Sequence, residues 1–169
     1  DWSKLDYRAV SERAIAKAEQ LLAEAEAAHS KSSQPGSPAA EVNAACAVSL
    51  RQLRGKLEEI AGEWRKAAAH YAHAARTLPA SRRADRWRNL IAEARALARQ
   101  GEERNDIKAL FEAAQVHAEA GSLVSEQDAP CEWAEASMEL GQLLLMLGER
   151  ESRPERYLAA ALHFKPAVD

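Results

Sequence analysis

Small and apolar residues recur at steps of three and four along most of this 169-residue chain. That spacing places them on one face of an α-helix, and it differs from the alternation that a half-buried β-strand requires. Alanine, the best helix former, supplies 38 of the residues, whereas β-branched residues are sparse. The sequence therefore predicts an all-α protein.

Composition narrows the class of protein further. Charged residues make up 29% of the chain and apolar residues 47%, which excludes a disordered chain and a membrane protein. No stretch approaches the roughly 18 consecutive apolar residues that a membrane span requires. The formal charge of −3 does not fit a wholly basic nucleic-acid binder. A chain of this length is expected to fold as one domain with a sizeable core.

The start of the chain and its cysteines bear on its location. The sequence begins Asp1-Trp2-Ser3 without Met, so we expect a fragment or a processed chain. No apolar segment of the signal-peptide kind opens it. Cys46 and Cys131 suggest neither a disulfide framework nor a zinc motif, so both are expected to be reduced thiols. The expected location is cytoplasmic.

Breaks in the periodic pattern divide the chain into seven expected helices. Residues 1–29 are expected to hold a capping or pairing helix that begins near residue 3, and the polar residues 30–38 a flexible loop. Residues 39–169 form the rest of a single domain. The other helices are expected at residues 38–61, 63–78, 82–100, 106–120, 130–148 and 154–165.

Residues with special backbone preferences mark the expected helix ends. Gly101 and Gly121 follow the last periodic residues of their helices, and Gly101 is predicted to be a left-handed C-cap. Ser152 stands three residues before Glu155, which is the spacing of a capping box. Ser152 is therefore predicted to begin the last helix.

The chain repeats itself at an interval of 47 residues. When the sequence is shifted by that amount, small residues meet small residues and most large residues meet large ones. The matched pairs are Ala94 with Gly141, Leu97 with Leu144, Gly101 with Gly148, Phe111 with Leu158, Ala113 with Ala160, His117 with Phe164 and Ala120 with Ala167. A shorter copy lies earlier, in residues 50–79. The six later helices are therefore expected to form three versions of one helix hairpin.

Residues 62–79 resemble the second helix of a known family, the tetratricopeptide repeat. The residues that carry this likeness are Ala67, Tyr71, Ala74 and Pro79. Residues 50–57 resemble the first helix of that repeat, although Arg54 stands where the family has a small glycine. Residues 132–151 are similar to a longer-loop variant that is common in bacterial repeat proteins. The likeness covers about residues 38–169.

The resemblance implies an α-solenoid of about three antiparallel hairpins, in which the first helix of each hairpin lines a concave groove. It also implies a protein-binding scaffold. The residues that it turns toward the groove are Arg51, Arg88, Arg95, Arg99, Met138 and Gln142. Arginines in such a groove would hold carboxylates through charge-assisted hydrogen bonds.

Charge is distributed unevenly along the chain. Residues 1–47 carry a net charge of −2, residues 48–104 carry +6, and residues 105–169 carry −7. One interpretation is a basic stripe that attracts an acidic peptide or the acidic end of another copy. The other interpretation is a solvated face whose charges meet no partner.

Catalytic and metal-binding patterns do not stand out in the sequence. It has no Ser-His-Asp order, glycine-rich phosphate loop or pair of pocket carboxylates, so we expect no enzyme, no cofactor and no metal site. His70 and His73 lie three residues apart, but no third ligand is evident, so they are expected to lie half-exposed on an outer helix. His117 takes the place of Phe164 in the repeat and is expected to pack. The same packing role is expected of Trp64, Trp87 and Trp133.

Two functions stay open at this point. The first is a protein-interaction module that binds an acidic peptide or protein segment in its groove. The alternative is a structural or oligomerisation segment of a larger protein, with self-association. A nucleic-acid regulator is disfavoured, because acidic residues interrupt the arginine-rich helix and the last third of the chain is acidic.

Overall fold

A computed structural model of the chain describes residues 40–164 and eight separate helical positions between residues 13 and 27. Within residues 40–164 the chain forms six α-helices and no strand, which confirms the all-α prediction. The expected capping helix at residues 1–29 lies largely outside the described residues. The expected loop at residues 30–38 lies wholly outside them, as do residues 165–169.

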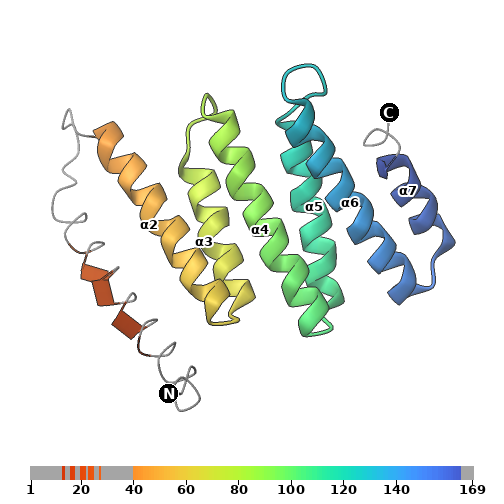
Figure 1. Ribbon diagram of the computed structural model, residues 1–169, viewed down its shortest axis with the longest axis horizontal. Helices are drawn as coiled ribbons and strands as arrows, with labels where there is room; N and C mark the ends of the chain where they lie inside the picture. The colour runs from red at the N-terminus through yellow and green to blue at the C-terminus, as the bar shows by residue number, and fades with distance from the viewer. Residues whose placement is uncertain are drawn as a thin grey trace, which may run out of the picture.

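The described helices follow one another in a row (Figure 1), and each packs on the next helix in the chain. Their bounds are Ala40–Ile60 for α2, Trp64–Thr77 for α3, Arg83–Glu103 for α4, Ile107–Ser122 for α5, Pro130–Glu151 for α6 and Pro154–Phe164 for α7. Short connections make α2–α3, α4–α5 and α6–α7 three antiparallel hairpins, at the places where the repeat was found. Helix α2 lies at one end of the row and α7 at the other.

Small residues let the two helices of a hairpin approach closely. A Cβ added to Gly55 of α2 would lie 2.7 Å from Cζ of Tyr71 on α3. A Cβ added to Gly141 of α6 would lie 2.8 Å from Cε1 of Phe164 on α7. Both distances are shorter than real carbon contacts, so the aromatic ring occupies the space that a side chain would need. The first and third hairpins therefore share one packing device.

The predicted role of Gly101 as a C-cap is wrong. Helix α4 continues to Glu103, and Gly101 is buried in its last turn, where a Cβ would collide with Leu110 of α5. The left-handed residue in this turn is Asn105, with φ at 53°. Asparagine tolerates that conformation better than most residues do. The glycine is required by the close approach of α5, and its backbone freedom is not used.

The predicted capping box at Ser152 is also wrong. Ser152 has φ at 54° and ends α6 in the left-handed conformation, whereas an N-cap residue needs an extended backbone. Its backbone N–H donates to the carbonyl oxygen of Gly148. Gly148 and Gly121 both lie inside their helices, so neither glycine ends one.

The core runs through several helices. Its largest cluster joins α3, α4, α5 and α6, and its members include Tyr71, Leu97, Leu110, Leu143 and Leu147. Alanines fill many of the contacts between these large side chains, which keeps the helices close. None of the helices that the structure describes is both long enough and apolar enough to cross a bilayer.

Candidate functional site

A groove of about 470 Å³ opens between α4 and α6, the first helices of the second and third hairpins. The residues that line it are Arg95, Ala98, Arg99, Glu102, His117, Glu139, Gln142, Leu143 and Met146. Three of the six predicted groove residues, Arg95, Arg99 and Gln142, come together here. Two helices about 40 residues apart in the chain thus supply one site.

The other three predicted groove residues lie elsewhere. Arg51 of α2 has its Nη1 3.5 Å from Nδ1 of His70. Arg88 is exposed near the start of α4, and its Nη1 lies 2.9 Å from Oδ1 of Asp85. Met138 is exposed on α6 but does not belong to the groove lining.

Arg95 links the two walls of the groove. Its Nε donates to both oxygens of Glu139, at 3.0 and 3.2 Å, and its Nη2 makes close ion pairs with Glu135 and Glu139. The two carboxylates raise the pKa of Arg95, so its positive charge is held firmly. The side chain is half exposed, which limits the strength of these ion pairs. Arg95 therefore links α4 to α6 within the chain.

His117 of α5 closes the bottom of the groove. Its side chain is 2% exposed, and its Nε2 lies 3.3 Å from Oε2 of Glu139. Its Nδ1 has no hydrogen-bond partner among the described residues. Burial, reinforced by the charge of Arg95, lowers the pKa of His117 to about 4. The ring is therefore neutral near pH 7, and it is packed as the repeat predicted.

The groove combines charge with an apolar wall. Arg99 has 61% of its side chain exposed and only a loose pair with Glu102, at 3.6 Å. Gln142 is exposed and offers both a donor and an acceptor. Met146 is half-buried and adds apolar surface, and Leu143, also in the lining, is buried.

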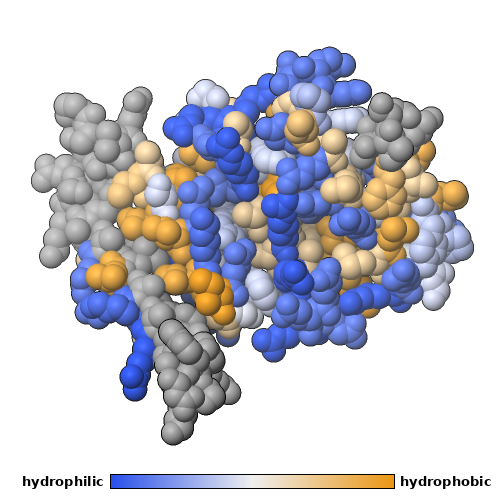
Figure 2. Space-filling view, viewed as in Figure 1, coloured by the Kyte–Doolittle hydropathy of each residue, from blue (hydrophilic) through white to orange (hydrophobic). Residues whose placement is uncertain are grey.

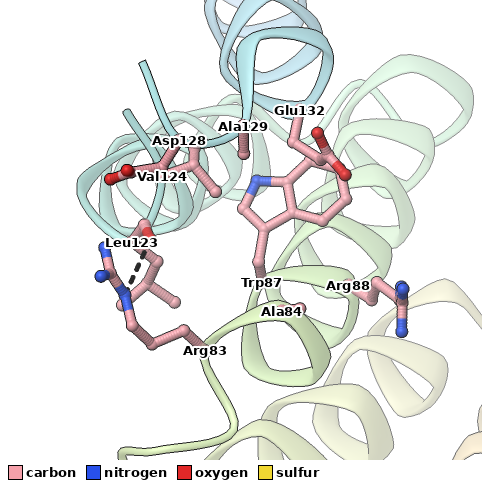
Figure 3. A pocket seen from close by; sticks show the side chains of 9 residues that line it. All are labelled: Arg83, Ala84, Trp87, Arg88, Leu123, Val124, Asp128, Ala129 and Glu132. Carbon is pink, nitrogen blue, oxygen red and sulfur yellow. Dashed lines mark hydrogen bonds between the residues drawn. The ribbon is translucent and has the colours of Figure 1, made fainter. Parts of the chain in front are cut away.

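A second, smaller pocket of about 190 Å³ surrounds Trp87 (Figure 3). It lies between the first turns of α4 and the 123–129 segment that precedes α6, and Ala84, Leu123 and Val124 line its walls. Trp87 is 7% exposed, which confirms that it packs. Its indole nitrogen points toward the 123–129 segment and has no hydrogen-bond partner among the described residues.

In residues 40–164 and the other described positions, no group of three or more His, Cys, Asp or Glu side chains could hold a metal ion. His70 is half-buried on α3, as expected, whereas His73 is exposed rather than half-exposed.

The sequence analysis missed the two carboxylates that pair with Arg95. Glu135 and Glu139 lie one helical turn apart on α6, so both face the same neighbour. That spacing was the available signal. It could not show that Arg95, 40 residues earlier, is their partner.

Comparisons with protein-family models, with curated proteins and with solved structures found no match to this chain.

Proposed function

We propose that this chain is a protein-interaction module built of tetratricopeptide-like helical repeats, and that it binds an acidic protein segment in the groove between α4 and α6. The observation that carries this proposal is the joint lining of the groove by Arg95, Arg99 and Gln142. These residues come from the first helices of two hairpins, where the resemblance places the ligand.

Arg99 is the residue that meets the partner's carboxylate. It is the more exposed of the two arginines, and its pair with Glu102 is long enough to exchange for a better one. Arg95 is occupied by Glu135 and Glu139, which neutralise its charge, so its part is to hold α4 and α6 together beside the groove. These contacts give the two arginines different roles, with Arg99 binding the partner and Arg95 linking the two helices.

An aliphatic side chain of the partner fits the apolar wall beside Arg99. Leu143 is buried at the base of that wall, and Met146 is half-buried. Methionine adapts to side chains of different shape, which suits a surface that accepts related sequences. Exposed ion pairs are worth about 0–1 kcal/mol each, so affinity comes from the combination and is modest.

Fluorescence anisotropy with a labelled peptide of alternating Glu and Leu tests the proposal. The wild type is expected to bind, and Arg99→Glu to bind about tenfold more weakly, because it replaces attraction by repulsion. Lys108→Glu is the matched control, because Lys108 lies on α5, outside the groove lining, with 82% of its side chain exposed.

Equal affinity of the wild type, Arg99→Glu and Lys108→Glu for the Glu-Leu peptide would refute the proposal. A peptide with Gln in place of Glu should bind more weakly to the wild type. This Gln peptide should bind the wild type and Arg99→Glu with nearly equal affinity, since it lacks the carboxylates with which Arg99 would pair.

A further inference from the structure

Helix α7 carries an exposed apolar face. Leu158 is 71% exposed and Leu162 is 74% exposed, the highest values among the large apolar side chains of the described residues. They lie four residues apart, so they are neighbours on one side of the helix. Tyr157 adds a side chain that is 40% exposed. Figure 2 shows hydrophobic colour over α7, at the right-hand end of the row.

The internal repeat shows what this face does elsewhere in the molecule. Leu158 and Ala161 of α7 are the counterparts, 47 residues on, of Phe111 and Ala114 of α5. Phe111 and Ala114 pack against the core cluster that joins α3, α4, α5 and α6, and the guanidinium of Arg156 in the next hairpin lies 4.9 Å from the centroid of the Phe111 ring. The part of this α5 face that holds Phe111 and Ala114 is therefore exposed on α7, whereas Leu162 has as its counterpart Gln115, which is exposed on α5. Helical-repeat proteins normally require a polar outer face at a terminal repeat.

We propose that this face of α7 joins two copies of the chain through a two-fold interface, with α7 antiparallel to α7 of the partner. Leu158 and Leu162 of each copy cover the same residues of the other. Within the chain α5 is covered by α6 at a hairpin boundary, and in the dimer α7 would be covered by α7 of the second copy. It goes beyond the groove and does not depend on it.

The charges of α7 support an antiparallel pair. Glu155 lies in its first turn and His163 in its last turn. Antiparallel packing brings each Glu155 near the partner's His163, and it sets the opposite ends of the two helix dipoles side by side. Parallel packing would place like groups together.

A head-to-tail contact with α2 of a second copy fits less well. Helix α2 exposes Leu53 and Ile60, but these are seven residues apart, and the cationic Lys56 lies between them on the same face. Leu158 and Leu162 form an uninterrupted pair. A two-fold contact also needs only one surface, and closed dimers of this kind are the commonest protein oligomers.

The dimer is expected to be weak. One helix of 11 residues buries less area than a standard protein interface. We therefore expect a dissociation constant in the micromolar range or above. Sedimentation velocity from about 1 μM to 1 mM should therefore show the mass rise from the monomer's 18.5 kDa toward twice that value.

Leu158→Glu and Leu162→Glu should each keep the chain monomeric at every concentration. Both side chains are exposed, so the variants should fold, and circular dichroism checks that they do. Leu53→Glu is the matched control, because it places the same charge on a leucine that is 52% exposed at the other end of the row. It should dimerise like the wild type.

A cysteine cross-link distinguishes the two geometries. Cys46 and Cys131 are exposed and free, and both are first replaced by Ser. Ala161→Cys in that background should form a disulfide-linked dimer under mild oxidation, because a two-fold axis brings two copies of residue 161 together. Four results would each overturn the proposal. They are a wild type that stays monomeric, a Leu158→Glu variant that dimerises like the wild type, a Leu53→Glu variant that does not dimerise, and the absence of a cross-link through residue 161.

Discussion

Single residues fix how closely the helices approach. Gly55 and Gly141 each face an aromatic ring of the next helix, whereas Gly121 faces open space. All three are glycines inside helices, where glycine costs about 0.5–1 kcal/mol relative to alanine. This cost in stability is offset only where a side chain of the next helix fills the space beside the glycine. Replacing glycine by alanine is therefore expected to destabilise the chain at Gly141 and to stabilise it at Gly121.

Gly141→Ala should lower the free energy of unfolding by about 1–3 kcal/mol, because the new methyl group collides with the ring of Phe164. Gly121→Ala should raise it by about 0.5–1 kcal/mol, because an added Cβ meets nothing within 4 Å in the described structure. Urea unfolding measures both. A loss of stability in both variants would mean that the α6–α7 contact is not the reason for glycine at position 141.

The buried imidazole of His117 makes stability depend on pH. Its pKa in the folded chain is about 4, below the ordinary 6.5, so the unfolded chain binds the proton first. The stability that the neutral ring allows is complete above pH 6.5 and is lost as the pH falls toward 4, by about 1–3 kcal/mol. His117→Phe, which copies Phe164 of the next repeat, should remove this part of the pH dependence of urea unfolding. An unchanged slope would contradict the burial of a neutral ring.

Glu93 acts in the opposite direction. Burial, with a contribution from Glu119, raises the pKa of Glu93 to about 7, although Arg76 opposes the rise. A raised carboxyl pKa favours folding below pH 4.5, and this stability is lost as the pH rises through 7. Glu93→Gln should therefore be more stable than the wild type at pH 8 by about 1 kcal/mol and nearly equal to it at pH 4.5. The slopes due to Glu93 and His117 offset each other between these pH values, so each needs its own variant.

At the scale of elements, periodicity predicted six of the seven expected helices where the structure has them, and the seventh lies largely outside the described residues. The helix ends were less predictable. Gly101 looked like a cap because cap glycines and close-contact glycines occupy the same place in a sequence. The left-handed turns use Asn105 and Ser152 instead. A glycine pattern alone does not show whether backbone freedom or the neighbour's side chain requires it.

The groove was predictable only in part for a similar reason. Steps of four and seven place Arg88, Arg95 and Arg99 on one face of α4, and two of them do line the groove. The carboxylates that pair with Arg95 do not lie on α4, so the periodicity of α4 gives no sign of them. Glu135 and Glu139 come from α6, and a single sequence does not give the offset between two helices that pack across a hairpin boundary.

Arg95→Gln should weaken the link between α4 and α6. Glu135 and Glu139 would then repel each other one turn apart, and the expected loss of unfolding free energy is about 1 kcal/mol, since the pairs are half exposed. The same change should raise the pKa of His117, because the positive charge that disfavours its protonation is removed. An NMR titration of the imidazole measures this shift. Arg88→Gln, whose pair lies within one helix turn, is the control and should leave the pKa of His117 unchanged.

At the scale of the whole molecule, part of the charge asymmetry of the sequence is used internally. Two arginines of the segment with a net charge of +6 form ion pairs with the segment of −7 across hairpin boundaries. Arg65 of α3 pairs with Asp106 and with Glu112 of α5, at 2.8 and 2.9 Å. Arg95 of α4 likewise pairs with Glu135 and Glu139 of α6, so it too joins the basic segment to the acidic one. Segment charges alone could not distinguish this internal pairing from a surface for a partner, and the groove retains only Arg99 as a loosely held cation.

Salt should therefore destabilise the folded chain. Raising NaCl shortens the Debye length from about 30 Å at 0.01 M to about 8 Å at 0.15 M, which screens the attraction between the two segments beyond their direct contacts. Each half-exposed pair contributes about 0–1 kcal/mol, so the unfolding free energy should fall by about 1 kcal/mol over this range. A variant with Arg65→Gln and Arg95→Gln together should respond less, because both bridges between hairpins are gone while the other surface charges remain. Urea unfolding at the two salt concentrations gives the comparison. An equal response of the variant and the wild type would show that the asymmetry is not used inside the fold, and it would leave more of the basic segment available to an acidic partner.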